Sequence, residues 1–170
     1  SVDKGSSDME RVLKMQTGLL IAAIASFVTA NAALALDGKV FPGKGSKETW
    51  LSASRIANDG IALTEAKRHD AAVAKFQQSI AMYPYADASY RNLGVIFEER
   101  AKPGDLLKAE TAYKKACELD PKDWRNWNAL GNALAYQDKL QQSIVAYEKA
   151  KACCPTEESR KKLAACIEEV

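Results

Sequence analysis

Residues 124–155 read WRNWNALGNALAYQDKLQQSIVAYEKAKACCP, and this stretch contains two successive runs of helical periodicity. The apolar residues at helical spacing are Trp127, Leu130 and Leu134 in the first run and Ile144, Tyr147 and Ala150 in the second. Residues three and four apart share one face of a helix, so each run predicts an amphipathic helix. Gly131 and Ala150 are small, and we expect the two helices to cross there.

The same spacing occurs twice more, earlier in the chain. Pro84, Pro121 and Pro155 lie 37 and 34 residues apart, and periods of this size are typical of helical solenoids. The middle unit contains Tyr90, Leu93, Gly94, Phe97, Ala109, Tyr113 and Ala116, and the first unit contains Ile56, Gly60, Leu63, Ala72, Phe76 and Ser79. The middle unit has an extended turn at residues 102–105, and the first unit has Asp59 where the pattern expects leucine.

This pattern resembles the tetratricopeptide-repeat (TPR) family over residues 51–170. The resemblance implies an all-α helical solenoid with three helix pairs, at about 53–86, 87–123 and 124–157, and a capping helix at 156–170. Thr156 is the expected N-cap of that last helix. A single helix pair cannot bury its own apolar face, so we expect the pairs to stack into one continuous core.

The N-terminal part has a different character: a polar segment at 1–17, a hydrophobic segment at 18–36 and a flexible linker at 37–50. As a helix, the hydrophobic segment would be about 28 Å long, close to the roughly 30 Å hydrocarbon core of a bilayer. It therefore predicts a single transmembrane helix. The segment also reads as an export signal, because Arg11 and Lys14 precede it and small residues at 30–35 suit a signal peptidase.

Basic residues flank the hydrophobic segment on both sides, so the distribution of positive charge does not select an orientation. The signal-like order of charge and apolar residues favours repeats on the exported side of the membrane, in a lumen or periplasm. A thylakoid membrane is one candidate.

Composition and motifs argue against several other classes. The net charge of +2 gives no large basic field, so no nucleic-acid partner is predicted. The four cysteines lack the paired spacing of a zinc site, and no metal or cofactor is expected. The segment Gly38–Gly45 is close to a phosphate-binding loop but has glycine where a hydroxyl side chain is needed. No catalytic motif is present, so we predict a protein that is not an enzyme.

In TPR proteins resembling this one, the first helix of each pair lines a concave groove that takes an extended peptide or a helix of a protein partner. The residues at those positions, and thus the predicted partner-binding residues, are Arg91, Val95, Glu98, Arg125, Asn128, Asn132 and Tyr136. Asn128 and Asn132 lie one turn apart and suit the amide groups of an extended chain. Ala57 and Ile61 replace the lysine and asparagine with which chaperone adaptors clamp a C-terminal carboxylate.

Together these features predict a membrane-anchored TPR scaffold that serves as an accessory or assembly subunit of a membrane protein complex. The alternative is a secreted, periplasmic or lumenal soluble adaptor whose signal peptide is cleaved. A third hypothesis is a nucleotide-dependent enzyme that uses Lys44.

Overall fold

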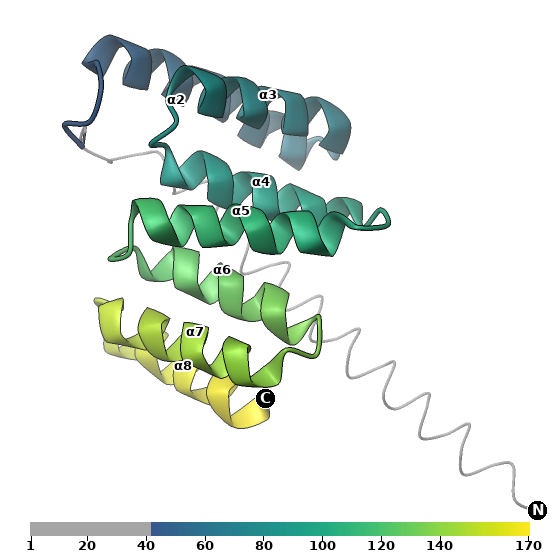
Figure 1. Cartoon of the computed structure of the whole chain (residues 1–170), viewed down its shortest axis with the longest axis vertical. Coiled ribbons are helices and arrows are strands. Elements are labelled where there is room, and N and C mark those ends of the chain that lie inside the picture. The colour runs from purple at the N-terminus through teal and green to yellow at the C-terminus, as the bar shows by residue number, and fades with distance from the viewer. Residues whose placement is uncertain (1–41) are drawn as a thin grey trace, which may run out of the picture. The chain divides into compact units, whose positions relative to one another are not determined.

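The repeat pattern folds into pairs of helices, as the sequence predicts. The computed structural model describes residues 42–170, which contain seven helices and no strand (Figure 1). None of these helices combines the length and the hydropathy that a membrane span needs, and the segments 1–17 and 18–36 lie outside the described residues. The helices are α2 (Lys47–Glu65), α3 (His69–Met82), α4 (Asp87–Arg100), α5 (Asp105–Leu119), α6 (Trp124–Ala135), α7 (Leu140–Cys153) and α8 (Glu157–Glu169).

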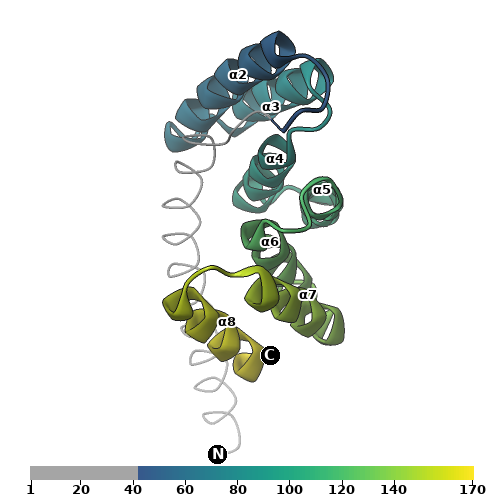
Figure 2. The ribbon, with the colours of Figure 1, turned by 90° about the vertical axis from the view of Figure 1, so that its left-hand side faces the viewer.

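The helices stack in chain order. Helices α2 and α3, α4 and α5, and α6 and α7 form three pairs, and α8 packs against α7. Successive pairs meet through α3 with α4 and through α5 with α6. Figure 2 shows α2, α4 and α6 along one side of the stack and α3, α5 and α7 along the other. The described part is therefore a solenoid of three repeats and a capping helix, in which each repeat packs mainly against its neighbours.

The paired helices cross at glycines, where an aromatic ring lies against the helix backbone. A Cβ atom at Gly94 would lie 2.5 Å from Cε1 of Tyr113, and one at Gly131 would lie 2.6 Å from Cδ1 of Tyr147. Carbon atoms in favourable contact are about 3.5–4.0 Å apart, so any side chain here must displace a buried ring. The predicted crossing at Gly131 is confirmed, and Tyr147 is the residue that requires it.

Two helix starts are fixed by hydroxyl side chains. Ser46 Oγ accepts hydrogen bonds from the backbone N–H groups of Glu48 and Thr49, so α2 begins at Lys47. The linker predicted to reach residue 50 therefore gives way to helix at residue 47. At α8, Thr156 accepts from the N–H group of Ser159, which confirms the predicted cap.

The extended turn between α4 and α5 is organised around a buried carboxylate. Asp105 has a fully buried side chain that accepts two hydrogen bonds from Arg100, both at 2.8 Å, and one from the backbone N–H of Lys102. Gly104, with φ of 81°, reverses the chain just before it. Arg100 also reaches Asp70 of the first repeat at 2.7 Å, and Lys102 contacts the same carboxylate. The turn therefore joins repeats 1 and 2.

The two ends of the stack are closed differently. At the C-terminal end, Leu163 of α8 is buried in a cluster with Tyr147 and Cys154, where it covers the last repeat. In the first repeat, Asp59 points to solvent and pairs with Lys75 at 3.3 Å. The leucine that the pattern expects at residue 59 is thus replaced by an exposed ion pair, and the helix pair forms nonetheless.

Candidate functional site

Helices α4 and α6 carry the predicted partner-binding residues, apart from Tyr136, which ends α6. The two helices are in contact and lie in the same row of the stack (Figure 2). We call the surface formed by Arg91, Val95, Glu98, Arg125, Asn128, Asn132 and Tyr136 the α4–α6 face. Its members differ strongly in exposure: Arg91, Val95 and Asn132 are buried, whereas Tyr136 is 37% exposed.

A buried ionic network occupies one end of the α4–α6 face. Arg91 Nη1 donates to Asp123 Oδ2 at 3.2 Å and to the side-chain oxygen of Asn126. Burial lowers the pKa of Arg91, while the neighbouring carboxylates of Asp123 and Asp87 oppose that change. Arg125 binds the same Asp123 carboxylate through two hydrogen bonds of 2.8 Å. Both predicted arginines are therefore held by Asp123, which the sequence analysis did not identify.

Asn126 connects this network to the preceding repeat. Its side-chain amide donates to the backbone carbonyl oxygens of Ala116 and Asp120, at 3.1 Å and 3.2 Å. Asn126 is fully buried, so these bonds satisfy a group that could not reach water. Repeats 2 and 3 are thus joined by polar contacts as well as by apolar packing.

Three carboxylates around the arginines form the one group within residues 42–170 that could hold a metal ion. Ligand atoms of Asp87, Asp120 and Asp123 lie within 4.8 Å of one another. Arg91 and Arg125 already neutralise much of their charge. The arrangement is that of an intramolecular ion-pair network.

The other end of the α4–α6 face contains a carboxyl group in an unusual environment. Glu98 Oε2 accepts a hydrogen bond from the hydroxyl of Tyr113 at 2.8 Å, and its other oxygen is buried with no hydrogen-bond partner among the described residues. Burial raises the pKa of Glu98 to about 7; the Tyr113 bond opposes this and the charge of Glu99 adds to it. Burial also raises the pKa of Tyr136 to about 12, with a contribution from Glu98.

Of the residues between these two ends, some are bonded within the fold and others are not. Asn132 accepts a hydrogen bond from the hydroxyl of Tyr147 at 2.8 Å, which ties its side chain to α7. Asn128 is half-buried and makes no side-chain hydrogen bond within residues 42–170. Asn128, Tyr136, the free oxygen of Glu98 and Nη2 of Arg91, which has no hydrogen-bond partner among the described residues, are therefore the polar groups that remain for a partner. Spacing in the sequence places all the residues on one face but does not reveal which side chains the fold has already engaged.

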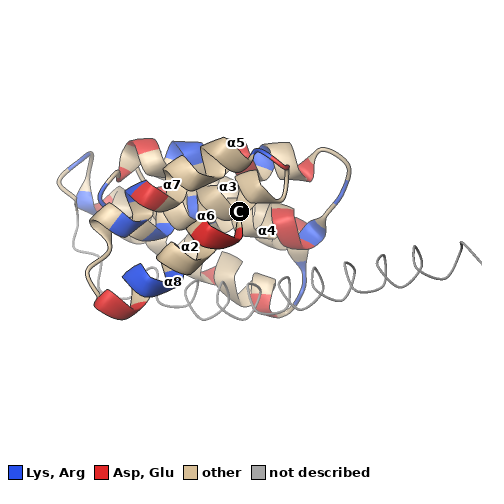
Figure 3. Ribbon diagram, turned by 90° about the horizontal axis from the view of Figure 1, so that it is seen from below, with Lys and Arg blue, Asp and Glu red and all other residues tan. Residues whose placement is uncertain are grey.

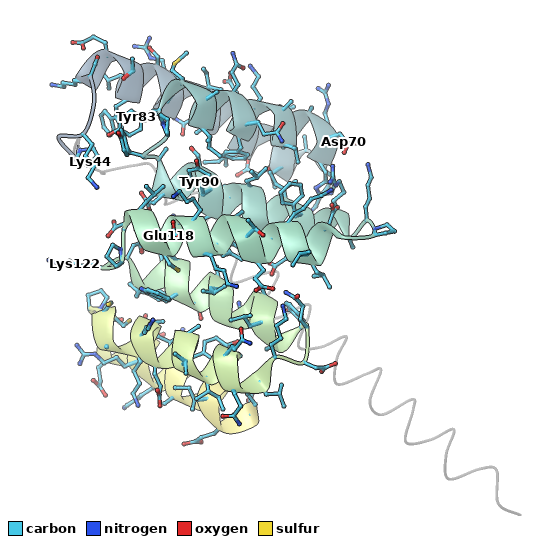
Figure 4. The ribbon with its side chains drawn as sticks, viewed as in Figure 1. Lys44, Asp70, Tyr83, Tyr90, Glu118 and Lys122 are labelled. Carbon is cyan, nitrogen blue, oxygen red and sulfur yellow. The ribbon has the colours of Figure 1, made fainter. Side chains whose placement is uncertain are left out.

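The glycine-lysine segment before α2 is engaged in contacts of its own. The hydroxyl of Tyr83 donates to the backbone oxygen of Lys44 at 2.6 Å, and Figure 4 shows these residues at the same end of the stack. Lys44 Nζ lies 5.9 Å from the centre of the Tyr85 ring. Ser46 binds the first free N–H groups of α2, which a phosphate would otherwise use.

Charges of both signs are mixed over the helices, as Figure 3 shows for the face seen from below. This distribution agrees with the small net charge of +2. It gives the described part no continuous basic surface of the kind that follows a nucleic-acid backbone.

Comparisons with known proteins identify the same repeats. Two family models, both described as tetratricopeptide repeat, match residues 59–123 and 112–145. The chain is similar to small glutamine-rich tetratricopeptide repeat-containing protein 2 of Mycosarcoma maydis, with 27% identity over 117 residues. That alignment covers 69% of this chain and 32% of the relative, so the chain spans about a third of that protein's length.

Two solved structures share the fold at low sequence identity. The Arabidopsis OM64 TPR domain has a TM-score of 0.63 and 17% identity, and the match covers 71% of this chain and 98% of that one. The Yersinia enterocolitica type III secretion chaperone SycD, in complex with a peptide of the translocator YopD, has a TM-score of 0.62 and 15% identity. The second match covers 69% of this chain and 91% of that one.

Proposed function

The chain belongs to the tetratricopeptide-repeat family, whose repeats mediate protein–protein interaction, and from this premise we propose a non-catalytic scaffold that holds a partner segment on the α4–α6 face. The observation that carries the proposal is a set of polar groups on this face that have no internal hydrogen-bond partner. These groups are Asn128, the buried Nη2 of Arg91 and the buried oxygen of Glu98, beside the exposed ring of Tyr136.

The chemistry of these groups favours an extended peptide or the polar edge of a helix. The amide of Asn128 both donates and accepts, so it can bond a backbone N–H and a backbone carbonyl. Glu98 adds an acceptor in a buried position, where a hydrogen bond is stronger than in water. Tyr136 supplies a rigid ring with a polar end, a combination that is common at binding surfaces. The Yersinia chaperone similar to this chain was solved with a peptide, which supports this mode.

The partner is not expected to be a chaperone tail held by its carboxylate. Ala57 is fully buried and Ile61 is half-buried, so neither position offers the cation or amide that such a clamp requires. The arginines of the α4–α6 face are both bound to Asp123. A terminal carboxylate would meet the negative charge of Asp123 beside them.

Site-specific photo-cross-linking tests the proposed face. A photoreactive residue at position 128 should cross-link to a defined partner in the native fraction, and one at the exposed position Val145 on α7 serves as control. When Tyr136→Ala is added to the protein with the photoreactive residue at position 128, the cross-linked product should decrease, because the partner loses its contact with the Tyr136 ring. Asn132 is left unchanged because it holds Tyr147. Equal cross-linking from positions 128 and 145 would contradict the proposal.

The hydrophobic segment at 18–36 suggests where this scaffold works. We propose that it anchors the chain, so that the repeats hold a subunit of a membrane protein complex during its assembly or as an accessory part. The repeats would then lie on the exported side, in a lumen or periplasm, with a thylakoid as one candidate membrane. The support is the length and the charge-free composition of the segment.

The alternative is a soluble exported adaptor from which the same segment has been cleaved. Mass spectrometry of the mature N-terminus after a carbonate wash of the native membranes separates the two. A start before Gly18 in the washed pellet supports the anchored scaffold, and a start near Ala33 or Leu36 in the supernatant supports the adaptor.

A further inference from the structure

A hollow lies on the other row of helices, where the sequence predicts no site. It is a groove of about 710 Å³ between α3 and α5, with α4 beneath it, and we call it the α5 groove. Its floor is formed by Tyr90, Leu93 and Phe97 of α4. Gln77 of α3 lines it, and so do α5 residues from Leu107 to Glu118. Figure 4 shows Tyr90 and Glu118 near one another at one end.

The dimensions of the α5 groove suit a short polypeptide segment. The lining residues of α5 extend over three helical turns, which corresponds to a length of about 16 Å. About five residues of extended chain, or three turns of helix, span that distance. The volume falls within the range of about 300–1,000 Å³ that is usual for ligand clefts.

Apolar surface is exposed along the wall of the groove. Leu107 is 62% exposed, and its neighbour Leu106 is 40% exposed. Neither leucine is among the buried residues of α5, which include Ala109, Ala112 and Tyr113. An exposed leucine at the groove, with a partly exposed one beside it, favours a surface that another molecule covers.

The charges on the groove are predominantly positive. Lys108, Lys114 and Lys115 line it, against a single carboxylate, that of Glu118. Each lysine side chain is about half-exposed or more, at 57%, 53% and 47%. The lining therefore offers an excess of cations at the solvent edge of an apolar floor.

The internal partners of two of these lysines are already neutralised by other cations. Lys114 Nζ lies 2.7 Å from Glu110, but Lys139 binds that carboxylate at 2.6 Å. Lys108 lies 3.4 Å from Asp105, which already accepts two hydrogen bonds from an arginine. The carboxylates that Lys108 and Lys114 contact are therefore shared with other cations, and Lys108 Nζ also lies 5.7 Å from the centre of the Phe97 ring on the groove floor.

We propose that the α5 groove binds a short acidic segment of a second partner protein. Its apolar side chains would cover Leu93, Phe97 and Leu107, and its carboxylates would pair with Lys108 and Lys114. This site lies on the opposite row of helices from the α4–α6 face (Figure 2). The chain would then hold two proteins at once, and the two sites can be tested separately.

The observations favour an acidic peptide over a nucleic acid or a lipid surface. A phosphate backbone requires a long basic track, whereas the net charge of the whole chain is +2. The apolar floor would face unpaired phosphates and contribute nothing to their binding. An acidic segment with apolar anchors matches both the floor and the rim.

The test uses the full chain and a fluorescent peptide of about twelve residues, with leucine or phenylalanine at helical spacing and glutamate elsewhere. Fluorescence anisotropy measures its affinity. Leu107→Glu should weaken binding about tenfold or more, because it places a negative charge on the groove wall. Val145→Glu is the matched control, since Val145 is 51% exposed on α7, and it should leave the affinity unchanged.

A second variant and several control ligands complete the binding test. Lys108→Gln removes one of the two lysines proposed to pair with the peptide and should also weaken binding, so it provides a second variant should Leu107→Glu not fold. A peptide with glutamine in place of glutamate should bind about tenfold more weakly. Equal binding of that neutral peptide overturns the proposed acidic partner, as does tighter binding of a DNA oligonucleotide or of phosphatidylserine vesicles. Loss of peptide binding in Asn128→Ala would assign it to the α4–α6 face and overturn a second site.

Discussion

Replacing Glu98 with glutamine should remove a pH dependence that this buried carboxyl gives to the stability of the fold. Burial raises the pKa of Glu98 from 4.5 to about 7, whereas the unfolded chain keeps the ordinary value. The folded form therefore binds this proton more tightly than the unfolded form does. The stabilising effect is complete below about pH 4.5, falls as the pH rises towards 7, and is gone above that.

The structure sets an upper limit for this effect. One pKa unit corresponds to about 1.4 kcal/mol, so the change from 4.5 to about 7 amounts to about 3 kcal/mol. Glutamine has nearly the same shape, remains neutral and can still accept the hydrogen bond from Tyr113. Glu98→Gln should therefore be up to about 3 kcal/mol more stable than the parent at about pH 8, and the difference should fall below about 1 kcal/mol at about pH 5.

Urea unfolding of the full chain, followed by circular dichroism at several values between about pH 5 and pH 8, measures this difference. The raised pKa values of Tyr113 and Tyr136 keep both groups neutral over this range. Glu168→Gln, on the exposed side of α8, should reproduce the parent profile. Identical profiles for parent and Glu98→Gln would refute the reasoning.

Three other substitutions test the packing and the ion pairs, the first two by the same unfolding measurement and the third by hydrogen exchange. Gly131→Ala should destabilise the chain by about 1–3 kcal/mol, because the new Cβ meets the Tyr147 ring and this outweighs about 1 kcal/mol of helix propensity; a gain in stability would show that the ring moves freely. Asp105→Asn should cost about 3 kcal/mol at neutral pH, because Arg100 loses its buried partner. The Arg100 hydrogen bonds lower the pKa of Asp105, so the parent should lose this contribution only in strong acid, and an unchanged stability at neutral pH would contradict the role of the pair. Leu163→Ala should increase hydrogen exchange in α8 by removing its buried anchor, and unchanged exchange would show that other contacts hold the helix.

The sequence predicts the helix pairs well because their packing follows a local periodicity. Gly131 and Tyr147 recur at the spacing that brings two helices together, and the structure places them in contact. The start of α2 depends instead on one side chain, Ser46, whose role as a cap is not visible in the apolar pattern. Boundaries are therefore less predictable than the elements themselves.

The candidate sites were less predictable because they depend on side chains that are distant in sequence. Arg91 occupies a groove position by its spacing, but Asp123, 32 residues later, holds it in the interior. Glu98 also occupies a groove position by its spacing. Only the fold shows that Tyr113 donates to one of its carboxylate oxygens, while the other oxygen is buried without a hydrogen-bond partner. The α5 groove had one visible signal, Leu107 next to Leu106, which gives α5 more apolar residues than one buried face requires.

The junction between repeats 1 and 2 and the junction between repeats 2 and 3 should respond differently to ionic strength. Repeats 1 and 2 are joined at the turn by Arg100 and Lys102 on Asp70, whose side chain is 70% exposed. Repeats 2 and 3 share Arg91 and Asp123, whose side chains are only 6% and 4% exposed. Salt screens exposed charges far more than buried ones, and the screening length falls from about 10 Å at 0.1 M to about 3 Å at 1 M. Rising ionic strength should thus weaken the junction of repeats 1 and 2 more than that of repeats 2 and 3, which gives the two junctions different sensitivities to salt.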